Sequence, residues 1–333
     1  MYSHILSLGA YTPERIMSND EVARMVDTSD DWIYNHTGIK NRRIADKNQA
    51  ASDLGVLASQ DAIKNAKSRD SGFDPGSIDL VLCATSTPDY PSFPATANII
   101  QDKLGLKNAG AMDIAAACTG FIYGLETAKA YVESGLAKTV LVVGTEVYSR
   151  IVNWKDRSTC VLFGDGAGAA IVSVAPEGSK SHLGRGFLRS KGSGAEYLIR
   201  PSGGSRNPFI PGVTATDDLY IQMNGRQVYI FAVQALTEAI LQTCKLNNLS
   251  FSDLDWVIPH QANRRIIEAA CERAEWDIAK FHLNMAEFAN TSAASIPIAA
   301  AEMVSKGLLK RGHKIATVGF GGGLTYGGNF FIY

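Results

Sequence analysis

Short apolar runs alternate with amphipathic segments along most of the chain. In the first half, the apolar runs at 78–86, 111–117 and 139–144 predict strands, and the segments at 95–104 and 119–134 predict helices. Such an alternation of strand and helix predicts an α/β fold with a largely parallel sheet.

The second half of the chain repeats this order. Strands are predicted at 254–259, 281–289 and 315–320, and helices at 262–274 and 292–307. Short stretches of sequence are also similar between the halves: IDLVL in the first half corresponds to LDWVI in the second. Any α/β protein repeats strand–helix units, so duplication needs a further argument.

Two polar residues provide that argument. Each half joins its middle strand to the following helix by a small-residue turn, which contains Cys118 in the first half and Asn290 in the second. This parallel placement favours a true duplication, with βαβαβ halves over 1–175 and 176–333. Because ligand sites lie outside the carboxyl ends of such strands, stacked halves would bring both turns to one central site.

Cys118 ends the run AMDIAAAC and begins a helical pattern. The first amides of a helix have no internal partners and carry the positive end of its dipole, so they stabilise a thiolate and can receive an oxyanion. Gly120 permits close approach of other groups. We therefore predict a nucleophile whose ionised form is favoured; the alternative is a buried structural cysteine.

His260 and Asn290 are the predicted partners of Cys118. Of the six histidines, His260 alone ends a clear apolar strand and begins a helix. Its alternative is a structural or surface histidine, and Asn290 taken alone is equally consistent with a helix N-cap. Cysteine, histidine and asparagine at equivalent turns together indicate acyl transfer through a thioester.

Two glycine-rich segments are candidates for ligand-binding loops. FGDGAGAAIV (163–172) fits G-x-G-x-x-A, but a strand pattern follows it where a nucleotide loop needs a helix, so we predict a turn. GFGGGLTYGG (319–328) also precedes a strand pattern. It is either a plain turn or the source of a second oxyanion amide, for which we select Gly322.

Composition narrows the function classes. The 333 residues have a net charge of −1 and a pI near 6.6, so no basic field indicates binding to nucleic acid or to an anionic membrane. The five cysteines include no CxxC pair, which argues against a disulfide framework or metal site and suits a reducing cytoplasm. The start of the chain lacks the pattern of a signal peptide, and no apolar run reaches about 18 residues.

Several separated motifs resemble one family, the β-ketoacyl-acyl-carrier-protein synthase III enzymes of the thiolase superfamily. The motifs are TSDDWIYNHTGI, DIAAACTGF, DRSTCVLFGDGAGAA, PHQANRRII, NTSAAS and GFGGGLTYG. The resemblance implies a thiolase-like stacked five-layer αβαβα fold and a homodimer. It also implies a condensing enzyme that starts fatty-acid synthesis.

The resemblance further implies a two-step cycle. Cys118 takes the acyl group of a short acyl-CoA, and a malonyl group on acyl-carrier protein then loses CO2 and attacks the acyl-cysteine. His260 and Asn290 would donate hydrogen bonds to the malonyl thioester oxygen, and a neutral histidine suffices for this. The amides of Cys118 and Gly322 would form the oxyanion site. Acyl-CoA is a substrate, and no permanent cofactor is implied.

Matching motifs also assign binding residues. Trp32, Arg157 and Asn263 would lie on the CoA path, where the alternative for Trp32 is a half-buried helix anchor. Phe93 would reach the acyl pocket of the partner subunit, unless it serves ordinary interface packing.

Three arginines, Arg264, Arg265 and Arg273, are candidates for meeting an acidic carrier protein. Arg265 and Arg273 are eight residues apart on one predicted helix, so they share a face. The alternative is a solvated helix face.

Some residues depart from the family pattern. His36 stands where an arginine is common, Ala289 replaces a glycine before Asn290, and Ile230 replaces a lysine. A paralogue with another acyl donor or acceptor in secondary metabolism is therefore an alternative. A papain-type cysteine hydrolase, a degradative thiolase and a non-catalytic acyl-binding scaffold are further alternatives. The thiolase would need a second cysteine near the C-terminal glycines, and none follows Cys271.

Overall fold

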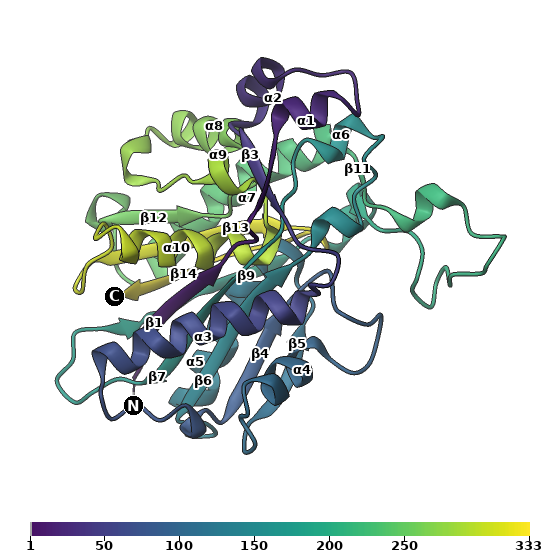
Figure 1. Cartoon of the computed structure of the whole chain (residues 1–333). Coiled ribbons are helices and arrows are strands. Elements are labelled where there is room, and N and C mark those ends of the chain that lie inside the picture. The colour runs from purple at the N-terminus through teal and green to yellow at the C-terminus, as the bar shows by residue number, and fades with distance from the viewer. Residues whose placement is uncertain (1) are drawn as a thin grey trace.

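The computed structural model describes residues 2–333, which form two β-sheets separated and covered by helices (Figure 1). The first sheet has the strand order β1-β7-β6-β4-β5. Its strands are β1 (Ser3–Tyr11), β4 (Leu80–Ala84), β5 (Gly110–Ile114), β6 (Thr139–Glu146) and β7 (Gly166–Val174). β4 runs parallel to both β5 and β6, whereas β7 is antiparallel to β6 and to β1.

The second sheet repeats these pairings. Its order is β12-β13-β14-β8, and β9 also pairs with β14. The strands are β8 (His182–Leu183), β9 (Phe187–Ser190), β12 (Trp256–Pro259), β13 (Lys314–Gly321) and β14 (Thr325–Ile332). β12 and β13 are parallel, and β14 is antiparallel to β13 and β8, as β7 is to its neighbours. The duplicated topology predicted from the sequence is therefore present.

Helices complete the predicted five layers. The first sheet is covered by α3 (Ala51–Arg69) and α4 (Thr96–Lys103). Between the two sheets lie α5 (Gly120–Glu133) and α10 (Ser295–Ser305). The second sheet is covered by α7 (Gly225–Leu246), and α8 (Arg264–Ala274) packs beside α7. The shorter elements are α1 (Asn19–Ala23), α2 (Asp30–Thr37), α6 (Arg157–Cys160), α9 (Met285–Phe288), β2 (Arg15–Ser18), β3 (Asn41–Ile44), β10 (Leu198–Ile199) and β11 (Gln222–Met223).

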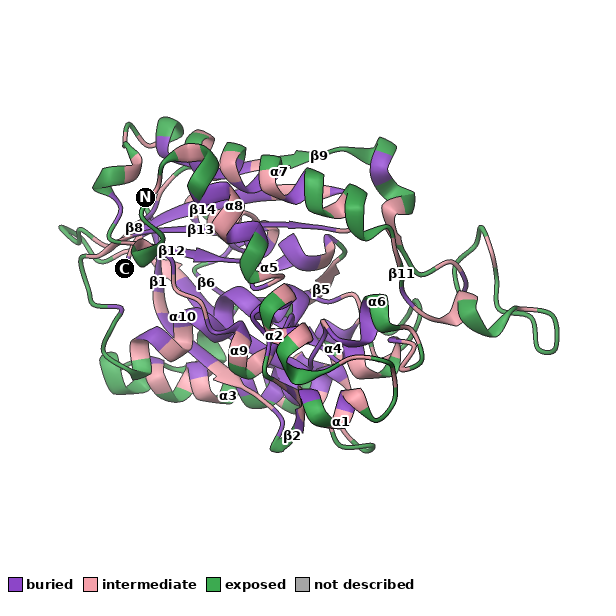
Figure 2. Cartoon of the chain, turned by 90° about the horizontal axis from the view of Figure 1, so that it is seen from above, coloured by how far each residue is buried: buried purple, intermediate pink, exposed green. Residues whose placement is uncertain are grey.

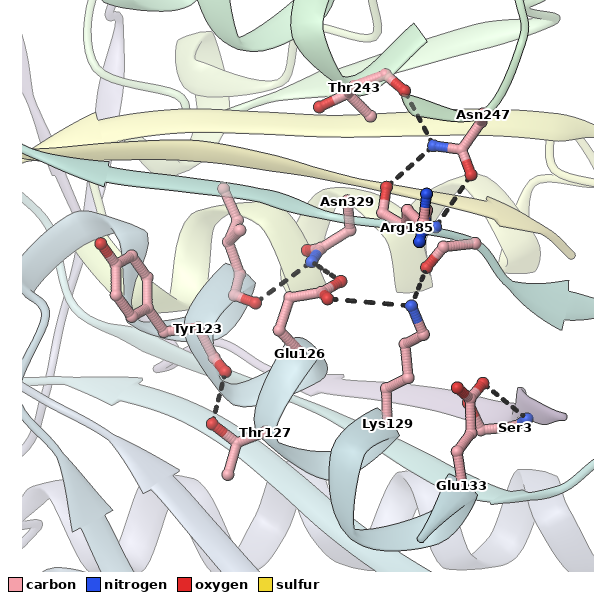
Figure 3. Close-up of polar contacts among 12 residues, drawn as sticks. Ser3, Tyr123, Glu126, Thr127, Lys129, Glu133, Arg185, Thr243, Asn247 and Asn329 are labelled. Atoms are coloured by element: carbon pink, nitrogen blue, oxygen red, sulfur yellow. Dashed lines mark hydrogen bonds and ion pairs between the residues drawn. The ribbon is translucent and has the colours of Figure 1, made fainter. Parts of the chain in front are cut away.

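The position of the central helices accounts for their apolar composition. α10 reads SIPIAAAEMVS and is buried along most of its length, because a sheet lies on each side of it. Figure 2 shows the same gradient, with buried residues in the strands and central helices and exposed residues on the outer helices. A polar tie also joins α5 to the second sheet, where Asn329 Nδ2 donates to Glu126 Oε1 at 2.9 Å (Figure 3).

The predicted strand at 281–289 is wrong. Only Phe281 pairs with the sheet, through a single parallel bridge to Val257. Beyond it the chain leaves the sheet, because Asn284 Nδ2 donates to the Glu302 carboxylate on α10 at 2.8 Å. The segment then forms the short helix α9. The other predicted strands and helices are present with ends shifted by a few residues.

The strands of the first sheet all lie within 3–174, and those of the second within 182–332. The division at residue 175 stays a prediction. Within residues 2–333, no helix combines the length and the apolar character needed to cross a membrane. Nor does this part of the chain hold a cluster of three or more His, Cys, Asp or Glu side chains arranged to bind a metal ion.

Candidate active site

A cavity of about 380 Å³ contains the three predicted reactive residues. Cys118, His260 and Asn290 all contribute to its lining, although they lie on three separate segments of the chain. The structure therefore brings together the side chains that the sequence analysis grouped by their positions at strand ends.

Cys118 lies in a 3-10 turn, Ala117–Thr119, that leads from β5 into α5. The corresponding turn before α10 is Ser292–Ala294. The first residue of each turn has a positive φ, 44° in one and 48° in the other. This match makes Ala293 the structural counterpart of Cys118, while Asn290 lies two residues before the second turn.

Close backbone packing fixes the Cys118 turn. A Cβ atom on Gly321 would lie 2.7 Å from the Cys118 nitrogen, so only glycine fits at this position of the second sheet. The Thr119 hydroxyl also bonds to that of Thr325 at 2.8 Å. Gly321 lines the cavity, whereas the predicted Gly322 is not among the lining residues, and its oxyanion role stays a prediction.

The ionisation of Cys118 differs from the expectation. The residue is only 4% exposed, and burial raises the pKa of its thiol to about 12, against the opposing effect of a hydrogen bond from Ser292. The predicted preference for the thiolate is therefore wrong. The reason is that desolvation of the charge outweighs the local amides and dipole of the helix start.

His260 follows β12 and is 1% exposed. Its backbone N–H donates to the Val318 carbonyl at 2.7 Å, and its ring Nδ1 lies 2.7 Å from the Ser295 hydroxyl. Burial lowers the pKa of the imidazole to about 3, so the ring is neutral near pH 7. A neutral histidine agrees with the role that the sequence analysis gave it.

Asn290 makes a local hydrogen bond and also lines the cavity, and its role as a partner of Cys118 stays a prediction. Its side-chain oxygen accepts a hydrogen bond from the Ser292 N–H at 2.9 Å, as a cap would. Its backbone is held on both sides, by the Leu162 carbonyl and by the Gly164 N–H, each at 3.0 Å. With the oxygen occupied and the residue lining the cavity, the amide Nδ2 is left as a donor toward a ligand.

The predicted CoA-binding residues line the same cavity. The Trp32 ring stacks on His36 with a centroid separation of 4.3 Å, and the Arg157 guanidinium lies 4.7 Å from the Trp32 ring. Arg157 also donates to the Asp27 carbonyl at 2.9 Å. Asn263 lines the cavity as well, while its side chain caps α8 and donates to the His36 carbonyl at 3.0 Å.

The remaining predicted residues lie outside the cavity. Phe93 is 85% exposed. Arg264, Arg265 and Arg273 are exposed on α8, and Arg264 pairs with Glu268 at 2.6 Å.

Sequence reasoning missed two groups of residues. The apolar wall of the cavity includes Leu198, Met223, Val228 and Phe231, from segments to which the sequence analysis assigns no role, and Leu324, from the GFGGGLTYG motif. The serines that contact the reactive groups, Ser292 and Ser295, were quoted only as part of NTSAAS. Serine is common in turns, so its identity alone does not indicate a functional residue. The position of these serines close to Asn290 is the feature of the sequence that could have indicated a role.

Comparison with known proteins decides the family. The family model described as 3-Oxoacyl-[acyl-carrier-protein (ACP)] synthase III matches residues 112–192, and its C-terminal counterpart matches 244–332. A protein of Caldanaerobacter subterraneus subsp. tengcongensis named beta-ketoacyl-[acyl-carrier-protein] synthase III is 47% identical over 97% of this chain and 95% of its own. The chain belongs to the synthase III family.

Other synthase III proteins agree. A relative of the same name from Aliarcobacter butzleri is 44% identical over 100% of this chain and 98% of its own. The crystal structure of 3-oxoacyl-[acyl-carrier-protein] synthase III from Aquifex aeolicus VF5 matches with a TM-score of 0.89 and 39% identity, covering 99% of this chain and 100% of that one. The predicted family, thiolase-like fold and acyltransferase class are confirmed, and these relatives favour neither the paralogue nor the hydrolase.

Ala289 provides a first test of how the site is held. Its φ of 57° and ψ of −158° fall in a region that is populated almost only by glycine. We expect Ala289→Gly to raise the free energy of unfolding by about 1 kcal/mol, measured by denaturant titration. Ala301→Gly, within α10, is the matched control and should lower it by about 1 kcal/mol. A loss of stability in both variants would contradict the strain at Ala289.

Proposed function

We propose that this chain catalyses the decarboxylative condensation of a short acyl-CoA with malonyl-acyl-carrier protein and so starts fatty-acid synthesis. The observation that carries the proposal is the convergence of Cys118, His260 and Asn290 on one cavity that Trp32 and Arg157 also line. All five cysteines are free thiols, which supports a cytoplasmic location.

In the first step the Cys118 sulfur attacks the thioester carbonyl of the acyl-CoA. The new bond is an acyl–sulfur bond on Cys118, the carbonyl–sulfur bond to CoA breaks, and the thiol proton leaves with CoA. Backbone amides beside the cysteine, with Gly322 as the second candidate, receive the oxyanion of the tetrahedral intermediate.

In the second step the malonyl group loses CO2, and the electron pair of the broken C–C bond forms a new bond to the acyl carbonyl. The Cys118 sulfur leaves and regains a proton. Negative charge develops on the malonyl thioester oxygen, where Asn290 Nδ2 and His260 Nε2 would donate hydrogen bonds.

The donor role of His260 depends on its tautomer. A proton on Nε2 requires the Ser295 hydroxyl to donate to Nδ1, but that hydroxyl also lies 2.8 Å from the Ser292 carbonyl oxygen. One hydroxyl proton cannot serve both acceptors fully. The tautomer that donates into the cavity is therefore the one in which Ser295 turns toward His260.

The two steps are separable by experiment. We expect intact-protein mass spectrometry to show an acyl adduct on mixing the wild-type chain with a short acyl-CoA, mapped to Cys118 and absent from Cys118→Ala. His260→Ala should still form the adduct, because the first step does not need the imidazole. Condensation with malonyl-acyl-carrier protein should fall by about 10²–10³-fold in this variant.

Two results would count against this assignment. A panel of acyl-CoAs that leaves no mass on Cys118 would remove the transferase proposal. Unchanged condensation in His260→Ala would remove the histidine from the second step and leave Asn290 as the only side-chain donor.

The carrier protein is proposed to meet α8, whose N-cap residue Asn263 lines the cavity. Arg265 and Arg273 are exposed there without a short ion pair among the described residues. We expect Arg265→Glu with Arg273→Glu to raise the KM for malonyl-acyl-carrier protein about tenfold and to leave acylation by acyl-CoA unchanged. Lys64→Glu with Lys67→Glu on α3 is the matched control. An equal effect of both pairs would indicate only a change of net charge.

A homodimer is proposed in which Phe93 of one subunit enters the acyl pocket of the other, since an exposed fraction of 85% is costly for a phenylalanine in water. We expect sedimentation at twice the 35.8 kDa chain mass. Phe93→Ala should shift the acyl chain length that is preferred in the adduct assay, whereas Phe209→Ala should not. A monomer, or an unchanged preference, would contradict this placement of Phe93.

A further inference from the structure

Glu146, at the end of β6, is a fully buried carboxylate that neither step above uses. Its oxygens accept hydrogen bonds from the Ser86 N–H at 3.0 and 3.1 Å, the Thr87 hydroxyl at 2.7 Å and the Thr85 hydroxyl at 3.3 Å. This set of donors holds the side chain in one orientation at the centre of the molecule.

Ser292 links Glu146 to Cys118. The Ser292–Ala294 turn packs on both β6 and the Ala117–Thr119 turn, and the Tyr148 hydroxyl donates to the Ser292 hydroxyl oxygen at 3.2 Å. From this position the Ser292 side chain lowers the pKa of both the Glu146 carboxyl and the Cys118 thiol. Ser292 is itself completely buried. Gly144, two residues before Glu146 on the same strand face, packs directly on the Ala293 carbonyl, so β6 and the Ser292 turn are in close backbone contact.

The charges around Glu146 point the same way. Burial raises the pKa of Glu146 to about 7, and hydrogen bonds from Thr87, Ser86 and Ser292 oppose that rise. Its negative charge in turn raises the pKa of Cys83 on β4, of Tyr148 after β6 and of Cys118. All three groups gain negative charge when they ionise, so each is disfavoured by an ionised Glu146.

We infer that Glu146 is a positioning residue that, through Ser292, controls how readily the Cys118 thiol loses its proton. Ser292 has a single hydroxyl proton, which it donates either to the carboxylate or to the sulfur. An ionised Glu146 competes for that proton and also repels a thiolate, whereas a protonated Glu146 leaves the hydroxyl free for the sulfur. This inference rests on the proposed role of Cys118 as nucleophile.

The test is the pH profile of Cys118 alkylation by iodoacetamide, with the labelled peptide mapped by mass spectrometry. Glu146→Gln should lower the thiol pKa and alkylate about tenfold faster at pH 8, the change that corresponds to one pKa unit. Ser292→Ala should move the profile the opposite way and slow the reaction, because it removes the donor to the sulfur. A residue that only supports the fold would not move the two profiles in opposite directions.

Glu126→Gln is the matched control. Glu126 is a half-buried carboxylate whose pKa is also raised by burial, but it contacts Asn329 and Lys129 between α5 and β14, as Figure 3 shows. We expect its alkylation profile to equal that of the wild type. Glu146→Asp should restore the wild-type direction of the profile.

If Glu146→Gln fails to fold, the pH profile of Cys118 alkylation in the wild-type chain still tests the inference. The wild-type alkylation rate should rise with pH along two limbs of equal slope that are offset by a shallower region around pH 7, where Glu146 ionises and raises the thiol pKa. A single uniform slope through neutral pH overturns the inference, as do shifts of the same sign in Glu146→Gln and Ser292→Ala. Alkylation needs neither acyl-CoA nor carrier protein, so its outcome is independent of whether the transferase proposal holds.

Discussion

The site depends on the contact between two short turns, Ala117–Thr119 and Ser292–Ala294, which meet between the two sheets. Each turn begins with a residue whose positive φ is unfavourable by about 1–3 kcal/mol for a side chain of this kind. These conformations persist because sheets and central helices fix the chain on both sides of each turn. Reactive groups placed there are held rigidly, which is what orientation of a nucleophile and its hydrogen-bond donors requires.

Sequence reasoning found the parallel strands β4, β5, β6, β12 and β13, the helices α4, α5, α8 and α10, and the three residues Cys118, His260 and Asn290, because buried strands and helix starts leave periodic and local signals. It gave no prediction for the two longest helices, α3 and α7. It failed at 281–289, where apolar residues resemble a strand but Asn284 bonds to Glu302 across a long sequence separation. It also misjudged the ionisation of Cys118. Local amides are visible in a sequence, whereas the desolvation produced by two stacked halves is a property of the assembled fold.

The residues that line the cavity differ in burial. Cys118, His260 and Asn290 are buried, and each is held by neighbouring backbone. Arg157 is exposed and lies against Trp32, with one hydrogen bond to the Asp27 carbonyl. The three buried residues are therefore fixed by the packed interior of the fold, whereas Arg157 depends on contacts at the surface.

The protonation states separate this site from that of a cysteine hydrolase. Papain-type enzymes use a thiolate beside an imidazolium, whereas burial here favours a neutral thiol and a neutral ring, with pKa values of about 12 and about 3. Loss of CO2 from a malonyl group requires no base, because the electron pair is released by breaking a C–C bond. Neutral donors then stabilise the charge that develops on the thioester oxygen, so a site that is poorly suited to general acid–base hydrolysis is well suited to condensation.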